Sequence, residues 1–236
     1  LHHGKIRVTT MHKHISEQYD NDLQTIRDLL MEMGGLVETQ VNDACTALVN
    51  HDVELAEQVR EVESRLNQFE VELDDQCVSI IAKRQPTAGD LRTVVSVMKV
   101  ITDLERIGDE ADRIAKMAID LLDADILEDH YSGFKGIHSG VIKMLKRALD
   151  AFARLDVENA LRVIEDDHDI DTAYKKLVRN CIKQMENNPD KVEDYVSLIW
   201  ASRALERVGD HAKNISEYVI YQVKGQDVRH ASSLDS

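Results

Sequence analysis

The sequence predicts an all-α protein made of two tandem three-helix bundles, and two observations support this fold class. The first is composition: aromatic residues are only 4% of the 236 residues and proline occurs twice, whereas aliphatic and acidic residues dominate. Such a chain favours helices packed through aliphatic side chains over a β-sandwich. The second is an internal duplication, because the string Leu-Glu-Arg-(Ile/Val)-Gly-Asp occurs at 104–109 and again at 205–210.

The duplication extends far beyond this string. The segment that begins at Asp52 matches the segment that begins at Asp156, at a constant offset of 104. The two prolines, Pro86 and Pro189, match at an offset of 103, and the repeated string matches at 101. An offset that changes only between segments indicates two copies of one unit whose loops differ in length.

Each unit divides into three helical stretches. The expected helices are 15–49, 52–83 and 90–123 in the first unit and 132–155, 157–186 and 190–223 in the second. Asp52 and Asp156 are natural N-caps for the middle helices. Thr87 followed by Asp90 resembles a capping box, and Pro189 suits a first helical position. Short connections make neighbouring helices antiparallel, so each unit should run up, down and up.

These boundaries give a domain plan. Residues 1–14 are interpreted as an N-terminal extension or tag remnant, 15–123 as the first repeat, 124–131 as a linker, 132–224 as the second repeat and 225–236 as a C-terminal tail.

The third helix of each unit separates an apolar seam from an acidic face. The expected seams are Val97, Val100, Leu104, Ile107, Ala111, Ile114, Ala118 and Leu121 in the first unit, and Leu198, Ala201, Leu205, Val208, Ala212, Ile215 and Val219 in the second. The acidic faces consist of Glu105, Asp109 and Asp112, and of Glu206, Asp210 and Glu217. At 100° per residue these carboxylates lie well away from the seams, so we expect no buried partner for them.

The acidic faces have two interpretations. A Glu and an Asp four residues apart repel each other on a helix, and a single such pair is usually solvated surface. Recurrence at equivalent positions favours a site, and carboxylates suit Mg²⁺, Mn²⁺, Fe or Zn²⁺. The middle helices add Glu63 with Asn67, and Asp167 with Asp171, which either complete such a site or are exposed polar positions.

Other residues near the repeated string also carry expectations. Gly108 and Gly209 each cost about 1 kcal/mol in a helix, which indicates close approach of another helix or of a bound group. Arg106 is expected to form a surface ion pair with Glu110 one turn on. His211, the counterpart of Glu110, is interpreted as a surface substitution.

Composition and motifs exclude several function classes. A net charge of −15 without a basic cluster argues against nucleic-acid binding. No signal peptide is found, and no run of about 20 apolar residues that could span a membrane. The three cysteines are widely spaced, which is typical of reduced cysteines that pack in the core of a cytosolic protein. Phosphate-loop, dinucleotide, nucleophile-elbow and zinc-protease motifs are missing, so we expect neither an enzyme nor an organic cofactor.

The doubled string and its flanks resemble the PhoU family of bacterial phosphate-uptake regulators. Residues 82–88 and 224–230 are similar to the proteobacterial members. The resemblance implies a cytoplasmic, non-enzymatic negative regulator of the phosphate-starvation response. It also implies two partners, the ATPase subunit of the phosphate ABC transporter and the PhoR sensor kinase, which is kept from activating PhoB. Membrane association would run through these partners, and a homodimer is left open.

The resemblance further implies multinuclear iron or zinc on the acidic faces. Glu105 and Asp109 would form one site and Glu206 and Asp210 the other, with Asp112 and Glu217 as additions. The first copy has Arg113 and Lys116 where the second has Asn214 and Glu217, so the second is the better metal site. The competing interpretations are a metal storage or buffering bundle and a plain helical scaffold without metal.

Overall fold

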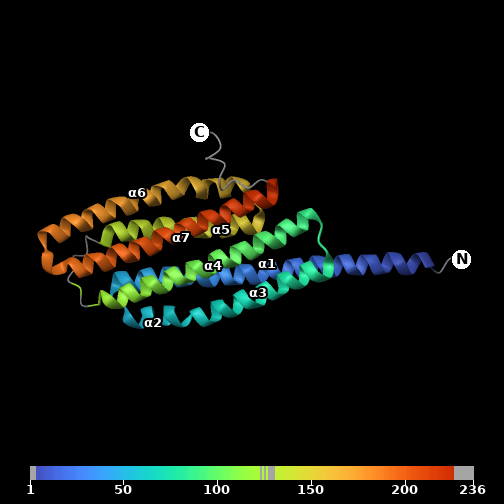
Figure 1. The fold of residues 1–236 in the computed structure, drawn as a ribbon, viewed down its shortest axis with the longest axis horizontal. Coiled ribbons are helices and arrows are strands. Elements are labelled where there is room, and N and C mark those ends of the chain that lie inside the picture. The colour runs from blue at the N-terminus through green and yellow to red at the C-terminus, as the bar shows by residue number, and fades with distance from the viewer. Residues whose placement is uncertain (1–3, 123, 125, 127–130, 226–236) are drawn as a thin grey trace.

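The computed structural model describes residues 4–122, 124, 126 and 131–225, with side chains described from residue 18 onward. Over these residues the chain forms α-helices and one short 3-10 helix, without a strand (Figure 1). The elements are α1 (Gly4–Asn50), α2 (Val53–Glu61), α3 (Glu63–Arg84), α4 (Ala88–Asp120), α5 (Ser132–Arg154), α6 (Val157–Asn187), η2 (Pro189–Lys191) and α7 (Val192–Lys224). The all-α prediction is confirmed.

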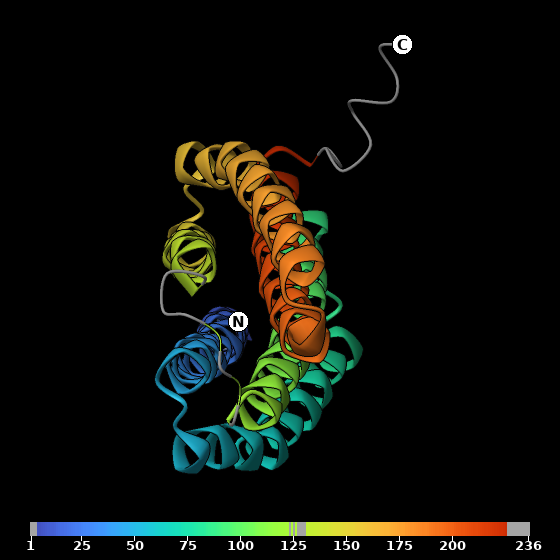
Figure 2. The same ribbon diagram turned by 90° about the vertical axis from the view of Figure 1, so that its left-hand side faces the viewer.

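The elements form two helical units, α1 to α4 and α5 to α7, that lie against each other along their length (Figure 1). Seen from one end, α1 and α5 lie on one side and α4 and α7 on the other (Figure 2). The hydrogen bonds that join α4 to α7 link early residues of one helix to late residues of the other, so these two helices are antiparallel. They form the main contact between the two copies of the repeat.

The middle helix of the first unit is broken, which corrects the prediction of one helix over 52–83. α2 ends at Glu61 and α3 begins at Glu63. At the break the Val62 amide donates to the Val59 carbonyl at 3.3 Å, and the Gln40 side chain of α1 donates to the same carbonyl at 3.2 Å. A side chain that inserts into the helical hydrogen-bond ladder interrupts it. In the second unit α6 is continuous.

Both predicted aspartate caps form. One oxygen of Asp52 accepts from the Leu55 amide at 3.0 Å, and one of Asp156 accepts from the Asn159 amide at 3.0 Å. Each carboxylate thus satisfies an amide that the first helical turn leaves unpaired.

The starts of α4 and α7 differ in detail from the predictions. Thr87 occupies the N-cap position, but its hydroxyl donates to the Asp90 carboxylate at 2.9 Å and the side chain caps no backbone amide. The reciprocal bonds of a capping box are therefore not formed. Pro189 opens η2, as its predicted first-turn position requires, and α7 follows from Val192.

The ends of the units can be compared with the domain plan only in part. α1 begins at Gly4, earlier than the expected start at residue 15. α4 ends at Asp120 and α5 begins at Ser132, so the predicted linker falls between them, and most of its residues lie outside the described part of the chain. The predicted tail lies outside it as well, apart from Gly225.

Both predicted apolar seams are buried throughout and belong to one continuous core. That core runs through both units, because α4 and α7 face each other at its centre. The three cysteines are free and buried, and burial raises the pKa of the Cys181 thiol to about 11. None of the described helices combines the length and the apolar character that a membrane crossing requires.

Candidate functional site

The second acidic face lies on α7, and its leading carboxylate is buried. Glu206 is only 6% exposed, which corrects the expectation that these carboxylates stay outside the core. One of its oxygens accepts a hydrogen bond from Arg203, and the other is buried with no hydrogen-bond partner. A buried carboxylate oxygen without a partner loses its hydration and gains nothing in return, so it is an energetically costly group.

Helix α6 adds two carboxylates to this face. Asp167 and Asp171 are close enough to Glu206 and Asp210 to disfavour their ionised forms. Asp167 is buried and accepts from the Lys213 ammonium at 2.8 Å. Asp167 is therefore not an exposed polar position.

The cluster shifts the proton affinity of its members. Burial raises the pKa of Glu206 to about 7, with the Asp210 charge adding to the effect and Arg203 opposing it. Burial also raises the pKa of Asp210, and Asp167 is the next contributor. The hydrogen bond to Asp167 raises the pKa of Lys213. These shifts indicate a compact group of interacting charges, which is a common property of functional sites.

The first acidic face is more exposed and is covered by basic side chains. Arg106 lies 3.4 Å from Glu105 and 3.8 Å from Asp109, so its predicted ion pair with the next turn is replaced by these two. Asp112 pairs with Arg60 of α2 at 3.2 Å and with Lys116 at 2.5 Å. Burial and Asp109 raise the pKa of Glu105.

The remaining predicted residues are Glu217 on α7 and the pair Glu63 and Asn67 on α3. Glu217 lies one turn after Lys213, and its negative charge helps to raise the pKa of Lys213. Glu63 and Asn67 are exposed on α3, although the Glu63 charge contributes to the pKa of Glu105. The six predicted carboxylates therefore lie on two separate faces, and only the second face has a buried carboxylate.

The two central glycines differ in their surroundings. A Cβ atom on Gly108 would lie 2.5 Å from a methyl carbon of Leu66, so α3 approaches α4 closely at this point. A Cβ on Gly209 would meet only ordinary contacts, at 3.8 Å from Ile170 and from Val141. The close approach of α3 thus explains why a glycine stands at position 108. At Gly209 the surrounding space would also accept a larger side chain such as alanine.

The fit of a metal ion to the second face can be tested on these contacts. The oxygen of Glu206 that lacks a partner and the neighbouring aspartates are the donor chemistry that hard cations take. Across the described residues, however, no three acidic, histidine or cysteine side chains converge as a ligand group. Arg203 and Lys213 hold Glu206 and Asp167, so an incoming cation would have to replace them.

A second set of buried charges joins the two units, and sequence reasoning missed its role. Asp103 of α4 accepts from Asn214 of α7 at 3.0 Å, and its Oδ1 lies 2.7 Å from His211 Nδ1. Glu110, 2% exposed, pairs with Arg207 across the helices at 2.8 Å. His211 is therefore an interface residue, which corrects its interpretation as a surface substitution.

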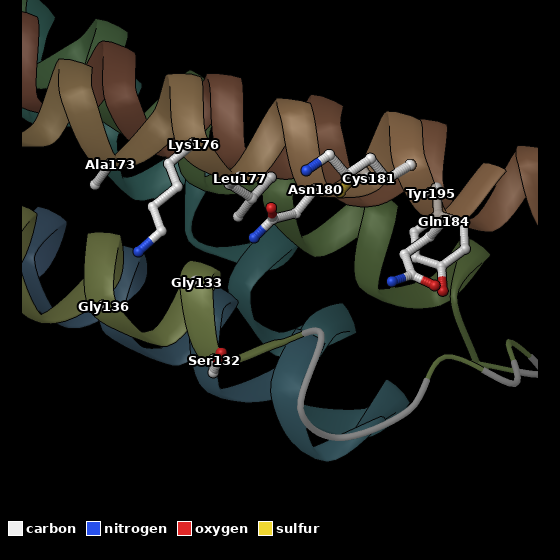
Figure 3. Close-up of a pocket in the computed structure, with 11 residues that line it drawn as sticks. Ser132, Gly133, Gly136, Ala173, Lys176, Leu177, Asn180, Cys181, Gln184 and Tyr195 are labelled. Carbon is white, nitrogen blue, oxygen red and sulfur yellow. The ribbon is translucent and has the colours of Figure 1, made fainter. Parts of the chain in front are cut away.

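A hollow of about 570 Å³ with a mixed polar and apolar lining lies between α5 and α6 (Figure 3). The side chains of Lys176, Asn180 and Gln184 line it from α6, opposite the start of α5 at Ser132 (Figure 3). None of the six predicted acidic residues lines it.

Comparison with known proteins gives one consistent result. The PhoU domain model matches twice, over residues 30–118 and 134–219. The chain is 50% identical over 217 residues to the phosphate-specific transport system accessory protein PhoU homolog of Pseudomonas putida, which covers 92% of this chain and 85% of that protein. It is 41% identical over 223 residues to the phosphate-specific transport system accessory protein PhoU of Escherichia coli K12, covering 93% and 91%.

Solved structures agree. The crystal structure of PhoU from Pseudomonas aeruginosa superposes with a TM-score of 0.86 at 46% identity, covering 88% of this chain and all of that one. The phosphate transport system regulatory protein PhoU from Streptococcus pneumoniae gives a TM-score of 0.83 at 27% identity, covering 89% and 99%. With two copies of the domain, close relatives over most of its length and the same fold, the chain belongs to the PhoU family.

Proposed function

We propose that this protein is a cytoplasmic, non-enzymatic negative regulator of the phosphate-starvation response that modulates phosphate uptake. In this proposal it links the ATPase subunit of the phosphate ABC transporter to the PhoR sensor kinase. The observation that carries the proposal is the near full-length similarity to relatives named as phosphate transport accessory proteins. A bundle with long exposed helical surfaces suits an adaptor, because each unit can present a separate face to a partner.

A deletion and complementation experiment tests the regulatory role. Loss of the gene should raise expression of a phosphate-starvation reporter in high phosphate, and the wild-type chain should restore repression. Failure of the deletion to change the reporter would refute the proposal. Pull-down from phosphate-replete cells then asks whether the transporter ATPase or the sensor kinase is bound, and sedimentation analysis determines whether the chain is a homodimer.

The same assay tests the second acidic face. Glu206→Ala with Asp210→Ala should derepress the reporter in high phosphate while circular dichroism shows an intact bundle. The matched control is Glu105→Ala with Asp109→Ala, which changes the equivalent positions of the first, more exposed face. A folded Glu206/Asp210 double variant that represses fully would remove this face from the mechanism.

The second candidate function is metal binding at the same face, either for regulation or for storage. It is favoured by the unpartnered oxygen of Glu206 beside Asp210 and the α6 aspartates. Iron, zinc, manganese or magnesium held there would supply a charge that offsets the carboxylates. Elemental analysis and titration calorimetry with Mn²⁺ and Zn²⁺ test it, with Glu206→Gln/Asp210→Asn as the reference. Tightly held multinuclear metal would favour storage, substoichiometric exchangeable metal would favour the regulator, and no binding would refute this candidate.

A further inference from the structure

A groove of about 470 Å³ runs along the outer side of the α4–α7 contact. It is lined by four basic side chains, one carboxylate and three apolar side chains: Arg113, Lys116, Arg203, Arg207, Glu110, Trp200, Met117 and Ala204. None of the six acidic residues assigned above lines the groove, although two of its cations, Lys116 and Arg203, pair with Asp112 and Glu206.

The charge of the groove is opposite to that of the protein. Four cations and one carboxylate line it, whereas the whole chain carries a net charge of −15. Glu110 is buried, and one of its oxygens lies 2.8 Å from both Arg113 and Arg207. A single carboxylate thus fixes two guanidinium groups, from different helices, at the edge of the groove. Lys116 pairs with Asp112 and Arg203 with Glu206, so the four cations face three carboxylates and one positive charge remains in excess. The two arginine side chains remain 53% and 39% exposed.

The groove also carries the only tryptophan of the chain. Trp200 is 65% exposed, the highest exposure among the large apolar residues that the structure describes. Met117 and Ala204 continue the apolar surface beside it. Tryptophan and arginine are, with tyrosine, the residue types enriched among those that dominate binding energy at protein interfaces. An exposed tryptophan between arginines therefore has the composition of an interface centre.

We propose that this groove binds an acidic segment of a partner protein. Carboxylates of the segment would accept from the N–H donors that Arg113, Lys116, Arg203 and Arg207 keep beyond their internal ion pairs, and an apolar side chain would pack on Trp200. This inference rests on the proposed adaptor function and specifies the chemistry of one partner contact.

Other occupants suit the groove less well. A second copy related by a two-fold axis would place this cationic surface against itself, which costs free energy through repulsion. An anionic lipid surface is flat and would be repelled by the net charge of the chain. Inorganic phosphate would leave the tryptophan and methionine surface unused.

Selection of peptides tests the proposal. A random peptide library free of tryptophan is displayed and selected on the wild-type chain, and selected peptides are titrated while the emission of Trp200 is recorded. Because the chain has a single tryptophan, its fluorescence reports on this groove alone. We expect selected peptides to be rich in Asp and Glu around an apolar residue and to shift the emission to shorter wavelength.

Matched variants locate the binding. Arg113→Gln/Lys116→Gln, and separately the charge reversal Arg113→Glu/Lys116→Glu, should weaken binding at least about tenfold. Trp200→Ala, followed by anisotropy of labelled peptide, should do the same. Arg65→Glu/Arg162→Glu changes exposed cations elsewhere, and Val71→Ala changes an apolar residue of similar exposure to Trp200; neither should alter binding. The milder glutamine variant guards against unfolding near Glu110.

Four results would overturn the inference. These are selected peptides without an acidic excess, affinities unaffected by the groove variants, no binder tighter than about 100 μM, and a Trp200 response to phosphatidylglycerol vesicles or to self-association instead of to peptides. The gene-deletion assay is independent of these measurements, so failure of the groove and failure of the regulatory role can be told apart.

Discussion

His211 Nδ1 lies 2.7 Å from Asp103 Oδ1, and this contact joins the third helices of the two repeats at a position that is almost fully buried. Asn214 donates to the same oxygen at 3.0 Å. One carboxylate from the first repeat thus satisfies two polar groups from the second. The two units are joined by polar as well as apolar contacts.

Asp103→Ala should therefore lower the free energy of unfolding by about 1–3 kcal/mol, because it leaves two partly buried polar groups, His211 and Asn214, without their partner. Urea unfolding followed by circular dichroism measures this. The control is Glu158→Ala, which removes an exposed i,i+4 ion pair with Arg162 and should cost less than about 0.5 kcal/mol. Equal effects of the two substitutions would contradict a structural role for Asp103.

The two central glycines should respond in opposite directions to alanine. Gly209→Ala adds a methyl group in ordinary contact with its neighbours and should stabilise the protein by up to about 1 kcal/mol through helix propensity. Gly108→Ala places its Cβ 2.5 Å from a methyl carbon of buried Leu66 and should destabilise by about 1 kcal/mol or more. Thermal unfolding of both variants tests this, and the combination Gly108→Ala/Leu66→Ala should show part of the clash relieved. Stabilisation by both single substitutions would contradict the close approach.

The raised pKa of Glu206 predicts a pH-dependent stability. The folded chain holds this proton more tightly than the unfolded chain, because the pKa rises from 4.5 to about 7. The contribution of Glu206 is therefore most favourable below pH 4.5 and is lost as the pH rises through 7. Glu206→Gln should remove this dependence. Its free energy of unfolding, relative to that of the wild type, should therefore rise by on the order of 2 kcal/mol as the pH increases from 4.5 to 8. Urea unfolding with EDTA at several pH values measures the difference, and parallel curves for the two proteins would refute it.

The aspartate caps of the middle helices should contribute similar amounts. Asp52→Ala and Asp156→Ala should each cost about 1 kcal/mol, since each leaves a first-turn amide unpaired. Asn in place of either aspartate should retain most of the stability, because its side-chain oxygen accepts the same bond. A loss with Asn as large as with Ala would show that charge, and not the cap geometry, provides the stabilisation. Chemical denaturation of the four variants decides between these.

Much of the fold follows from local sequence signals. The apolar seams at 3.6-residue spacing are buried as predicted, and Asp52 and Asp156 cap their helices. The break at Val62 could not be predicted, because no proline or glycine marks it. It coincides with Gln40, which reaches the Val59 carbonyl from another helix. Periodicity describes one helix at a time and contains no information about such a contact.

The candidate site shows the same limit. The angle around α7 places Glu206 away from the apolar seam, yet it is buried because α6 packs on that side with Asp167 and Tyr174. A helical wheel gives the direction of a side chain and not what covers it. The interface charges did leave one signal, since Glu110 and His211 are different residues at equivalent positions of two otherwise similar copies.

The α4–α7 contact has an evolutionary consequence. Two antiparallel helices from duplicated units resemble the interface of a homodimer, in which any substitution appears on both sides at once. Fusion into one chain removes that coupling. Asp103 has Ala204 as its counterpart, and Glu110 has His211, so each side of the contact carries charges that the other lacks. A single gene can therefore specialise one repeat while the other keeps the shape that both need, and the two faces of this protein are free to evolve towards different partners.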